Sequence, residues 1–241
     1  MSAASELKVS VWRGTAQGGA FQAFTVPRYD SQTVLDVVSW IQQNADPTLS
    51  YRFACRVGMC GSCAMMVNGT PRWTCRTHLS TVATGDMLEI APLRNLPVIK
   101  DLAAAMDRFF DKWVAAGGAH APSATRDDPV VAIEPDNAAR VTANESSECI
   151  NCAVCYAACD TVAGNPDYLG PAALNRAWTL VNDEKHGDVN GVLDAVSAYG
   201  GCHNCHSMGS CTAHCPNELD PLASIAGLKR ETVKRRLRGN A

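Results

Sequence analysis

Twelve cysteines in three groups of four are the feature that most limits what this chain can fold into. In chain order they are Cys55, Cys60, Cys63 and Cys75; Cys149, Cys152, Cys155 and Cys159; and Cys202, Cys205, Cys211 and Cys215. The first residues contain no apolar core preceded by basic residues, so we expect no export signal. Cysteines in a chain without an export signal indicate metal or redox ligation and not a disulfide framework.

A long stretch without cysteine separates the first group from the other two and suggests two domains. Residues 76–148 contain no cysteine, and within them the Gly-, Ala- and Pro-rich segment 115–129 is typical of a surface connection. We predict one domain at 1–105, which holds the first group, and another at 106–241, which holds the second and third groups.

The first domain is predicted to be mostly strand with one helix. Apolar residues within 33–44 recur at helical spacing, and Asp30 or Ser31 is available as the helix cap. A Gly-rich turn joins the first two strands, and an Asn-Gly turn joins the next two. This order predicts a small β-grasp unit. The expected strands are 7–12, 21–26, two within 63–75, and 86–93.

The second domain is predicted to be helical, so the whole chain is of the α+β class. Pro171 and Gly187 mark the start and end of one helix, and Asp220 followed by Pro221 is typical of a capped helix start. The expected helices are 101–118, 170–187, 190–201 and 220–239.

The first cysteine group has the spacing of a plant-type [2Fe-2S] site, C-x4-C-x2-C followed by a fourth cysteine. Gly58, Gly61 and the small Ser62 allow the backbone to pass close to a cluster and to direct N–H groups at its sulfurs. A zinc ribbon would show two C-x2-C pairs, and this loop shows one. The predicted ligands are Cys55, Cys60, Cys63 and Cys75.

The second group reads C-x2-C-x2-C-x3-C, the spacing of bacterial ferredoxins. In two-cluster ferredoxins the fourth cysteine of this run serves the other cluster, so Cys159 is assigned to a different site. A distant cysteine must then complete the first set. The predicted [4Fe-4S] ligands are Cys149, Cys152, Cys155 and Cys215.

The third group follows the same template with Met208 in place of one cysteine. A thioether is a poor substitute for a thiolate at that iron, whereas three thiolates suit a [3Fe-4S] cluster. We therefore predict that Cys159, Cys205 and Cys211 bind a [3Fe-4S] cluster. Removing one thiolate also removes negative charge, which should raise the reduction potential.

Cys202 is left over by this assignment and leaves two interpretations open. It lies one C-x2-C step before Cys205, so in another register it would reach the open corner and complete a third four-cysteine site. Alternatively, it is a small buried apolar residue that binds no metal.

Charge and hydropathy exclude several classes of protein. The net charge of −3 argues against a nucleic-acid binder held by bulk electrostatics. No run of about 18 apolar residues is present, so we expect no transmembrane segment. The basic residues within 228–239 indicate either a solvated helix face or contact with an anionic membrane surface or acidic partner.

With its three cysteine motifs in this order, the chain resembles the iron–sulfur subunits of succinate dehydrogenase and fumarate reductase over nearly its whole length. The resemblance implies an electron-transfer subunit that carries single electrons between the FAD of a flavoprotein subunit and a quinone held with cytochrome b-type membrane-anchor subunits. It implies a peripheral position at the cytoplasmic face of the membrane. The matching segments are 55–69, 91–102, 146–159, 164–177 and 205–221.

The same resemblance implies quinone contacts and also shows departures. His206 and Lys229 match quinone-contacting residues by their positions relative to the cysteines. Asp160 stands where family members usually have proline, the usual nearby tryptophan is missing, and Val57 replaces an acidic residue. These departures motivate an alternative in which the same subunit serves a thiol-linked or other non-quinone flavin enzyme. A structural zinc protein is a third hypothesis. No acid–base or nucleophile constellation appears, so dicarboxylate chemistry is expected on the partner.

Overall fold

The computed structural model describes residues 5–239, which divide by their contacts into two compact units. One unit runs to Met106 and also includes Ile150–Ala158, which carries part of the second cysteine motif. The other comprises Asp107–Cys149 and the chain from Cys159 onward. Ile150–Ala158 lies in the sequence beyond the predicted boundary after residue 105, and its contacts join it to the unit with the first cysteine group.

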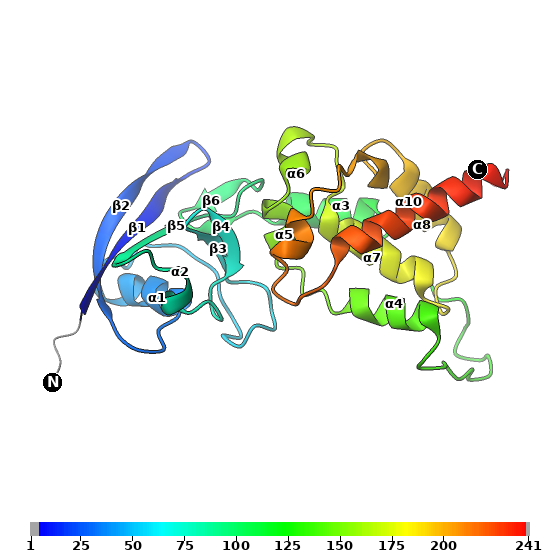
Figure 1. Cartoon of the computed structure of the whole chain (residues 1–241), viewed down its shortest axis with the longest axis horizontal. Coiled ribbons are helices and arrows are strands. Elements are labelled where there is room, and N and C mark those ends of the chain that lie inside the picture. The colour runs from blue at the N-terminus through cyan, green and yellow to red at the C-terminus, as the bar shows by residue number, and fades with distance from the viewer. Residues whose placement is uncertain (1–4, 240–241) are drawn as a thin grey trace. The chain divides into compact units, whose positions relative to one another are not determined.

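The first unit is built on a five-stranded sheet in the order β2-β1-β5-β3-β4 (Figure 1). β1 (Ser5–Thr15) and β2 (Gly18–Arg28) form the predicted antiparallel hairpin. β5 (Met87–Ala91) pairs in parallel with β1 and antiparallel with β3 (Ala64–Val67). The sheet is therefore mixed, as the predicted β-grasp order requires.

The second hairpin of the sheet carries the predicted Asn-Gly turn. β3 pairs antiparallel with β4 (Thr70–Trp73), and Asn68 and Gly69 between them both have positive φ, 47° and 74°. Two consecutive residues with positive φ form the turn whose twist matches that of paired strands. This hairpin matters for the site because cysteines flank it on both sides.

Helix α1 (Val34–Asn44) packs its apolar side onto the sheet. Its cap is Thr33, and the prediction of Asp30 or Ser31 is wrong. Thr33 accepts the Asp36 N–H through its hydroxyl, while the Asp36 carboxylate accepts the Thr33 N–H at 2.9 Å. This reciprocal capping box needs an acidic residue three positions after the cap, and only Thr33 of these three residues has one. A short helix, α2 (Leu79–Val82), follows the second hairpin.

The predicted helix at 101–118 begins later than expected. Residues before it form a small sheet of β6 (Val98–Lys100) and β7 (Ala103–Ala104), and α3 covers only Asp107–Ala115. Asp101 turns the chain between the two strands with φ of 49°. An aspartate with positive φ is incompatible with a continuing helix, so the apolar spacing from residue 102 misled the prediction.

Asp101 ties this turn to the large sheet through a buried carboxylate. It accepts the N–H groups of Gly14 at 3.1 Å and Ser50 at 2.9 Å and pairs with Arg13 Nε at 3.0 Å. Arg13 also pairs with Asp46. Hydrogen bonds from Thr48 first, and from Arg13 next, lower the pKa of Asp46 to about 2. One carboxylate therefore joins three distant segments of the unit.

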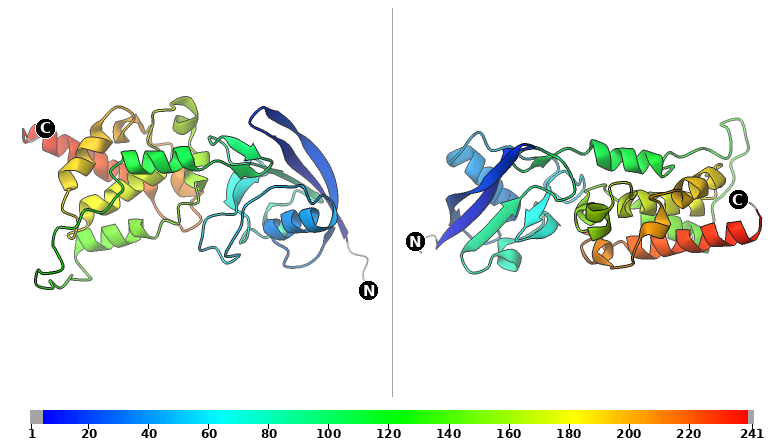
Figure 2. Two further views of the ribbon diagram at one scale, coloured as in Figure 1. Left: turned by 180° about the vertical axis from the view of Figure 1, so that it is seen from behind. Right: turned by 90° about the horizontal axis from the view of Figure 1, so that it is seen from above.

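The second unit is helical and has α7 (Pro171–Asn182) at its centre, in contact with α3, α4, α8 and α10 (Figure 2). Three alanines of α7, Ala172, Ala173 and Ala177, are buried. The helix ends at Asn182, before the predicted Gly187, because Asp183 is extended and its side chain accepts the Lys185 N–H. The remaining elements are α4 (Ala138–Ser147), α6 (Asp160–Gly164), α8 (Val189–Ser197), η1 (Cys202–Asn204), α9 (Ser210–Ala213) and α10 (Pro221–Leu237).

Of these helices, α10 was predicted from the sequence and α4 was not. α10 begins as predicted, with Asp220 as cap accepting the Ala223 N–H and Pro221 in the first turn. α4 is polar and was not predicted, since it lacks an apolar repeat. Among residues 5–239, no helix combines the length and the hydropathy needed to cross a bilayer.

The Asp101 contacts predict a large loss of stability on truncation. We expect Asp101→Ala to lower the free energy of unfolding of the first unit by about 3 kcal/mol, because two backbone donors and Arg13 lose a buried partner. Asp86→Ala is the control, since this carboxylate also pairs with an arginine but is 67% exposed, and its loss should cost about 0.5 kcal/mol or less. Equal effects in thermal or denaturant unfolding would contradict this account.

Candidate iron–sulfur sites

The β3–β4 hairpin brings two cysteines of the first group together. Cys63 precedes β3 and Cys75 follows β4, and the Cys75 N–H donates to the Cys63 sulfur at 3.4 Å. Thr74 fixes the pair, donating from both its N–H and its hydroxyl to the Cys63 carbonyl, at 3.2 and 2.8 Å. Both cysteines are buried against Leu35 of α1. The sheet therefore supplies one rigid half of the predicted [2Fe-2S] site.

The other half is a loop whose backbone N–H groups point at sulfur. The Cys55 sulfur accepts from Met59 N at 3.2 Å and from Val57 N at 3.5 Å, and the Cys60 sulfur accepts from Cys55 N at 3.5 Å. Arg56 and Gly58 have positive φ, which curls the loop so that these donors converge. Such donors stabilise thiolate and cluster charge, and the set of four sulfurs fits a [2Fe-2S] cluster.

The pKa values of the cysteines reflect the two halves. Hydrogen bonds from Cys55 and Ser62 lower the pKa of Cys60 to about 6. Burial, followed by the neighbouring Cys63, raises the pKa of Cys75 to about 12. The donors around the exposed Cys60 thus favour anionic sulfur, whereas burial of Cys75 disfavours its free thiolate.

Gly61 of this loop packs directly on the second cysteine motif. A Cβ at Gly61 would lie 2.7 Å from the Ile150 carbonyl oxygen and 2.9 Å from Cys152 Cα, and its φ is 69°. Both groups belong to the same unit as the loop. The glycine therefore serves close backbone approach between two cysteine motifs, in addition to the flexibility that the sequence suggested.

The predicted [4Fe-4S] ligands are placed as follows. Cys152 and Cys155 are buried in the first unit, where α5 (Val154–Ala157) begins after Ala153 with φ of 62°. The side-chain amide of Asn95 donates to the Tyr156 carbonyl at 2.9 Å and holds α5 in this unit. Cys149 and Cys215 belong to the second unit. The assignment of these four ligands stays a prediction from their spacing.

The three cysteines predicted to bind a [3Fe-4S] cluster line one pocket of the second unit. Cys159 precedes α6, Cys205 follows η1, and Cys211 lies in α9. Met208 lines the same pocket, at the position where the template would have a fourth cysteine. The Ser207 N–H donates to the Cys205 sulfur at 3.3 Å. This donor set of three thiols and a backbone N–H fits a cluster with three cysteine ligands.

Tyr168 is a residue of this pocket that the cysteine spacing did not indicate. Its side chain is 1% exposed, and burial raises the pKa of its hydroxyl, with further contributions from Cys205, Cys159 and Cys211. The residue lies in the segment 164–177, which the resemblance included, but nothing in the local pattern marked a tyrosine as part of a metal site.

Cys202 is not among the residues that line that pocket, although its carbonyl accepts the Cys205 N–H at 3.2 Å. It is 0% exposed, and burial raises the pKa of its thiol, which lies near the Thr232 hydroxyl of α10. This environment favours the interpretation of Cys202 as a buried residue of the helix packing.

The two residues implied in quinone contact, His206 and Lys229, both lie close to Cys205. The Lys229 ammonium of α10 donates to the Cys205 carbonyl at 2.7 Å. His206 is exposed and lines the pocket beside Cys205. Both are therefore close to the predicted [3Fe-4S] ligands.

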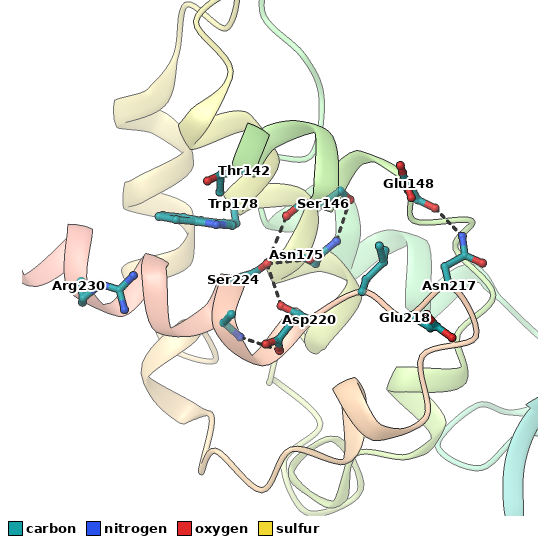
Figure 3. Close-up of a pocket in the computed structure, with 12 residues that line it drawn as sticks. Thr142, Ser146, Glu148, Asn175, Trp178, Asn217, Glu218, Asp220, Ser224 and Arg230 are labelled. Atoms are coloured by element: carbon teal, nitrogen blue, oxygen red, sulfur yellow. Dashed lines mark hydrogen bonds between the residues drawn. The ribbon is translucent and has the colours of Figure 1, made fainter. Parts of the chain in front are cut away.

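A separate cavity of about 590 Å³ lies among α4, α7 and α10 (Figure 3). At its base, the Ser224 hydroxyl donates to Asn175 Oδ1 at 2.9 Å, and Asn175 Nδ2 donates to the Ser146 carbonyl at 3.0 Å. No cysteine lines this cavity. Its buried polar groups hold three helices together.

Comparison with known proteins gives matches to both cysteine regions. Residues 7–111 match the family described as a 2Fe-2S iron-sulfur cluster binding domain, and residues 148–220 match the 4Fe-4S dicluster domain. The second match covers the second and third cysteine groups together.

Full-length relatives extend this similarity. The fumarate reductase iron-sulfur subunit of Escherichia coli O6:H1 is 34% identical over 97% of this chain and 96% of its own length. The mitochondrial succinate dehydrogenase [ubiquinone] iron-sulfur subunit 1 of Oryza sativa subsp. japonica is 34% identical over 82% of this chain and 70% of its own length. A chain of the Mycobacterium smegmatis Sdh1 complex in the apo form matches with a TM-score of 0.87, 25% identity and 98% coverage of both chains.

The close approach at Gly61 predicts a selective effect of adding one methyl group. We expect Gly61→Ala to destabilise the first unit by about 2–4 kcal/mol, because a left-handed alanine adds strain and its Cβ meets backbone atoms that cannot move away. [2Fe-2S] content, measured by visible circular dichroism, should fall with it.

Gly69→Ala is the matched control for this variant. Gly69 has a similar φ of 74°, but its Cβ would meet nothing within 4 Å, so only the strain of about 1 kcal/mol should appear. If both variants lose the same stability and retain the same cluster content, the packing of the two motifs is not the reason for the glycine.

Proposed function

We propose, from the premise that this chain belongs to the family of iron–sulfur subunits of fumarate reductase and succinate dehydrogenase, that it carries electrons between a flavoprotein subunit and a membrane quinone. The observation that supports this best is the convergence of Cys159, Cys205 and Cys211 on one pocket with Met208 in the fourth position. A three-ligand set of this kind suits a relay of electrons and not a structural zinc site, which is four-coordinate.

The proposed cofactors are one [2Fe-2S], one [4Fe-4S] and one [3Fe-4S] cluster, each of which would supply a one-electron redox step when bound. The chain's own groups hold and tune them. Backbone N–H groups of Val57, Met59 and Ser207 point at sulfurs and favour the more negative state. The absence of a fourth thiolate at Met208 acts in the same direction by lowering the total negative charge.

The partners in this proposal are an FAD-binding flavoprotein, which carries the dicarboxylate site, and cytochrome b-type anchor subunits, which hold the quinone. The chain would be peripheral, on the cytoplasmic face of the membrane. His206 and Lys229 are the proposed quinone contacts, since both lie beside the Cys205 loop. Lys229 already donates a hydrogen bond to the Cys205 carbonyl, so the exposed His206 is the more available of the two for a hydrogen bond to quinone.

A second candidate is the same electron relay in a flavin enzyme that uses a thiol or other non-quinone partner. Asp160 motivates it, because this carboxylate lines the pocket where the family usually has proline, and the usual tryptophan is missing. A quinone ring would meet a charged residue there in place of apolar ones.

The ligand assignment predicts different results at two neighbouring positions. Met208→Cys should supply a fourth thiolate and replace the EPR signal of the oxidised [3Fe-4S] cluster by that of a reduced [4Fe-4S] cluster. Cys202→Ser should leave the [3Fe-4S] signal in place, because Cys202 packs against α10. A [3Fe-4S] signal that appears only after the Cys202 substitution would show that Cys202 is a ligand.

The choice between quinone and another acceptor is tested on the intact complex, purified through a tag on this chain. We expect integral-membrane subunits to copurify and a quinol to reduce the clusters. His206→Ala should raise the KM for quinone about tenfold, the loss of roughly one hydrogen bond, while succinate oxidation by an artificial flavin-level acceptor is unchanged. A complex without membrane subunits that quinols do not reduce would favour the second candidate.

A further inference from the structure

The pocket of Cys159, Cys205 and Cys211 contains a buried hydroxyl, that of Tyr168, for which the described residues supply no well-formed hydrogen bond. Tyr168 Oη is inaccessible to solvent and makes no hydrogen bond of ordinary geometry with any residue that the structure describes. The side chain as a whole is 1% exposed. A buried hydroxyl without an acceptor costs about 1–3 kcal/mol, so such groups need an explanation.

The surroundings of this hydroxyl point to sulfur. Tyr168 lines the same pocket as Cys159, Cys205 and Cys211, and the Cys205 thiol is the neighbour close enough for a hydrogen bond, although its geometry falls short of one. A phenol hydroxyl is a hydrogen-bond donor, and negative charge on a nearby sulfur strengthens such a bond.

The backbone holds Tyr168 in place independently of the hydroxyl. The Leu169 N–H donates to the Gly200 carbonyl at 2.8 Å, and the Tyr168 N–H donates to the Asn165 carbonyl at 3.2 Å. Gly200 packs so closely that a Cβ there would lie 2.2 Å from the Asp167 carbonyl oxygen. The position of the ring is therefore held by contacts other than those of its hydroxyl, which makes the hydroxyl a preorganised donor.

We propose that Tyr168 donates its hydroxyl proton in a hydrogen bond to a cysteine sulfur of the third cluster and thereby raises that cluster's reduction potential. Reduction adds one negative charge, and an O–H donor that is itself inaccessible to solvent stabilises the reduced form more than the oxidised form. Tyr168 is thus a tuning residue for the last relay before the electron acceptor. This inference rests on the proposed [3Fe-4S] site.

EPR-monitored redox titration of the intact complex tests it. Tyr168→Phe removes only the hydroxyl, and we expect the midpoint potential of the [3Fe-4S] signal to fall while that of the [2Fe-2S] signal is unchanged. Tyr199→Phe is the matched control, since Tyr199 belongs to the same unit but is 82% exposed, and it should change neither potential. A [3Fe-4S] midpoint equal to that of the wild type in Tyr168→Phe would overturn the proposal.

A second measurement has the opposite expected sign and leaves the shape of the side chain nearly intact. Replacement of all tyrosines by 3-fluorotyrosine makes each phenol a stronger donor and should raise the [3Fe-4S] midpoint, whereas a fall or no change would contradict the inference. The same titration separates this inference from its premise. Wild-type protein without a [3Fe-4S] signal would refute the cluster assignment itself, whereas a signal insensitive to both changes would refute only the role of Tyr168.

Discussion

Ligation of iron by cysteine sulfur is the constraint on which both units depend. Clusters carry negative charge, so their ligands must be held together by a scaffold that also directs N–H groups at sulfur. In the first unit, the β3–β4 hairpin fixes Cys63 and Cys75, and a curled loop offers its amides to Cys55 and Cys60. In the second unit, helix ends and short turns bring Cys159, Cys205 and Cys211 to one pocket, where the Ser207 N–H donates to the Cys205 sulfur.

The packing of Gly61 on Ile150 and Cys152 suits a chain that passes electrons and does not only store them. Electron transfer slows steeply with distance, so successive cysteine motifs gain by direct backbone contact. A side chain at Gly61 would separate the two motifs, and the ferredoxin segment Ile150–Ala158 accordingly shares its contacts with the [2Fe-2S] unit. This arrangement explains why one glycine of the loop is needed for contact as well as for conformation.

Sequence reasoning succeeded where local chemistry is strict. The order of expected strands and helices predicted the fold class, and cysteine spacing predicted the families of both cluster domains. The Asn68-Gly69 turn defined a hairpin, and Asp220 with Pro221 marked the start of α10. It failed where a distant contact decides. The turn at Asp101 exists because Gly14 and Ser50 donate to its carboxylate, and no local pattern shows those partners. Tyr168 likewise lies in the pocket of Cys159, Cys205 and Cys211 because of tertiary packing alone.

The central claim is that the chain holds three different clusters in series, and EPR-monitored redox titration of the intact complex with iron and sulfide analysis tests it most directly. The account predicts three signals that titrate separately, one [3Fe-4S] seen in the oxidised protein and one [2Fe-2S] and one [4Fe-4S] seen on reduction, with about nine irons per chain. A colourless protein that contains zinc, or one with two four-iron clusters in the second and third cysteine groups, would contradict it.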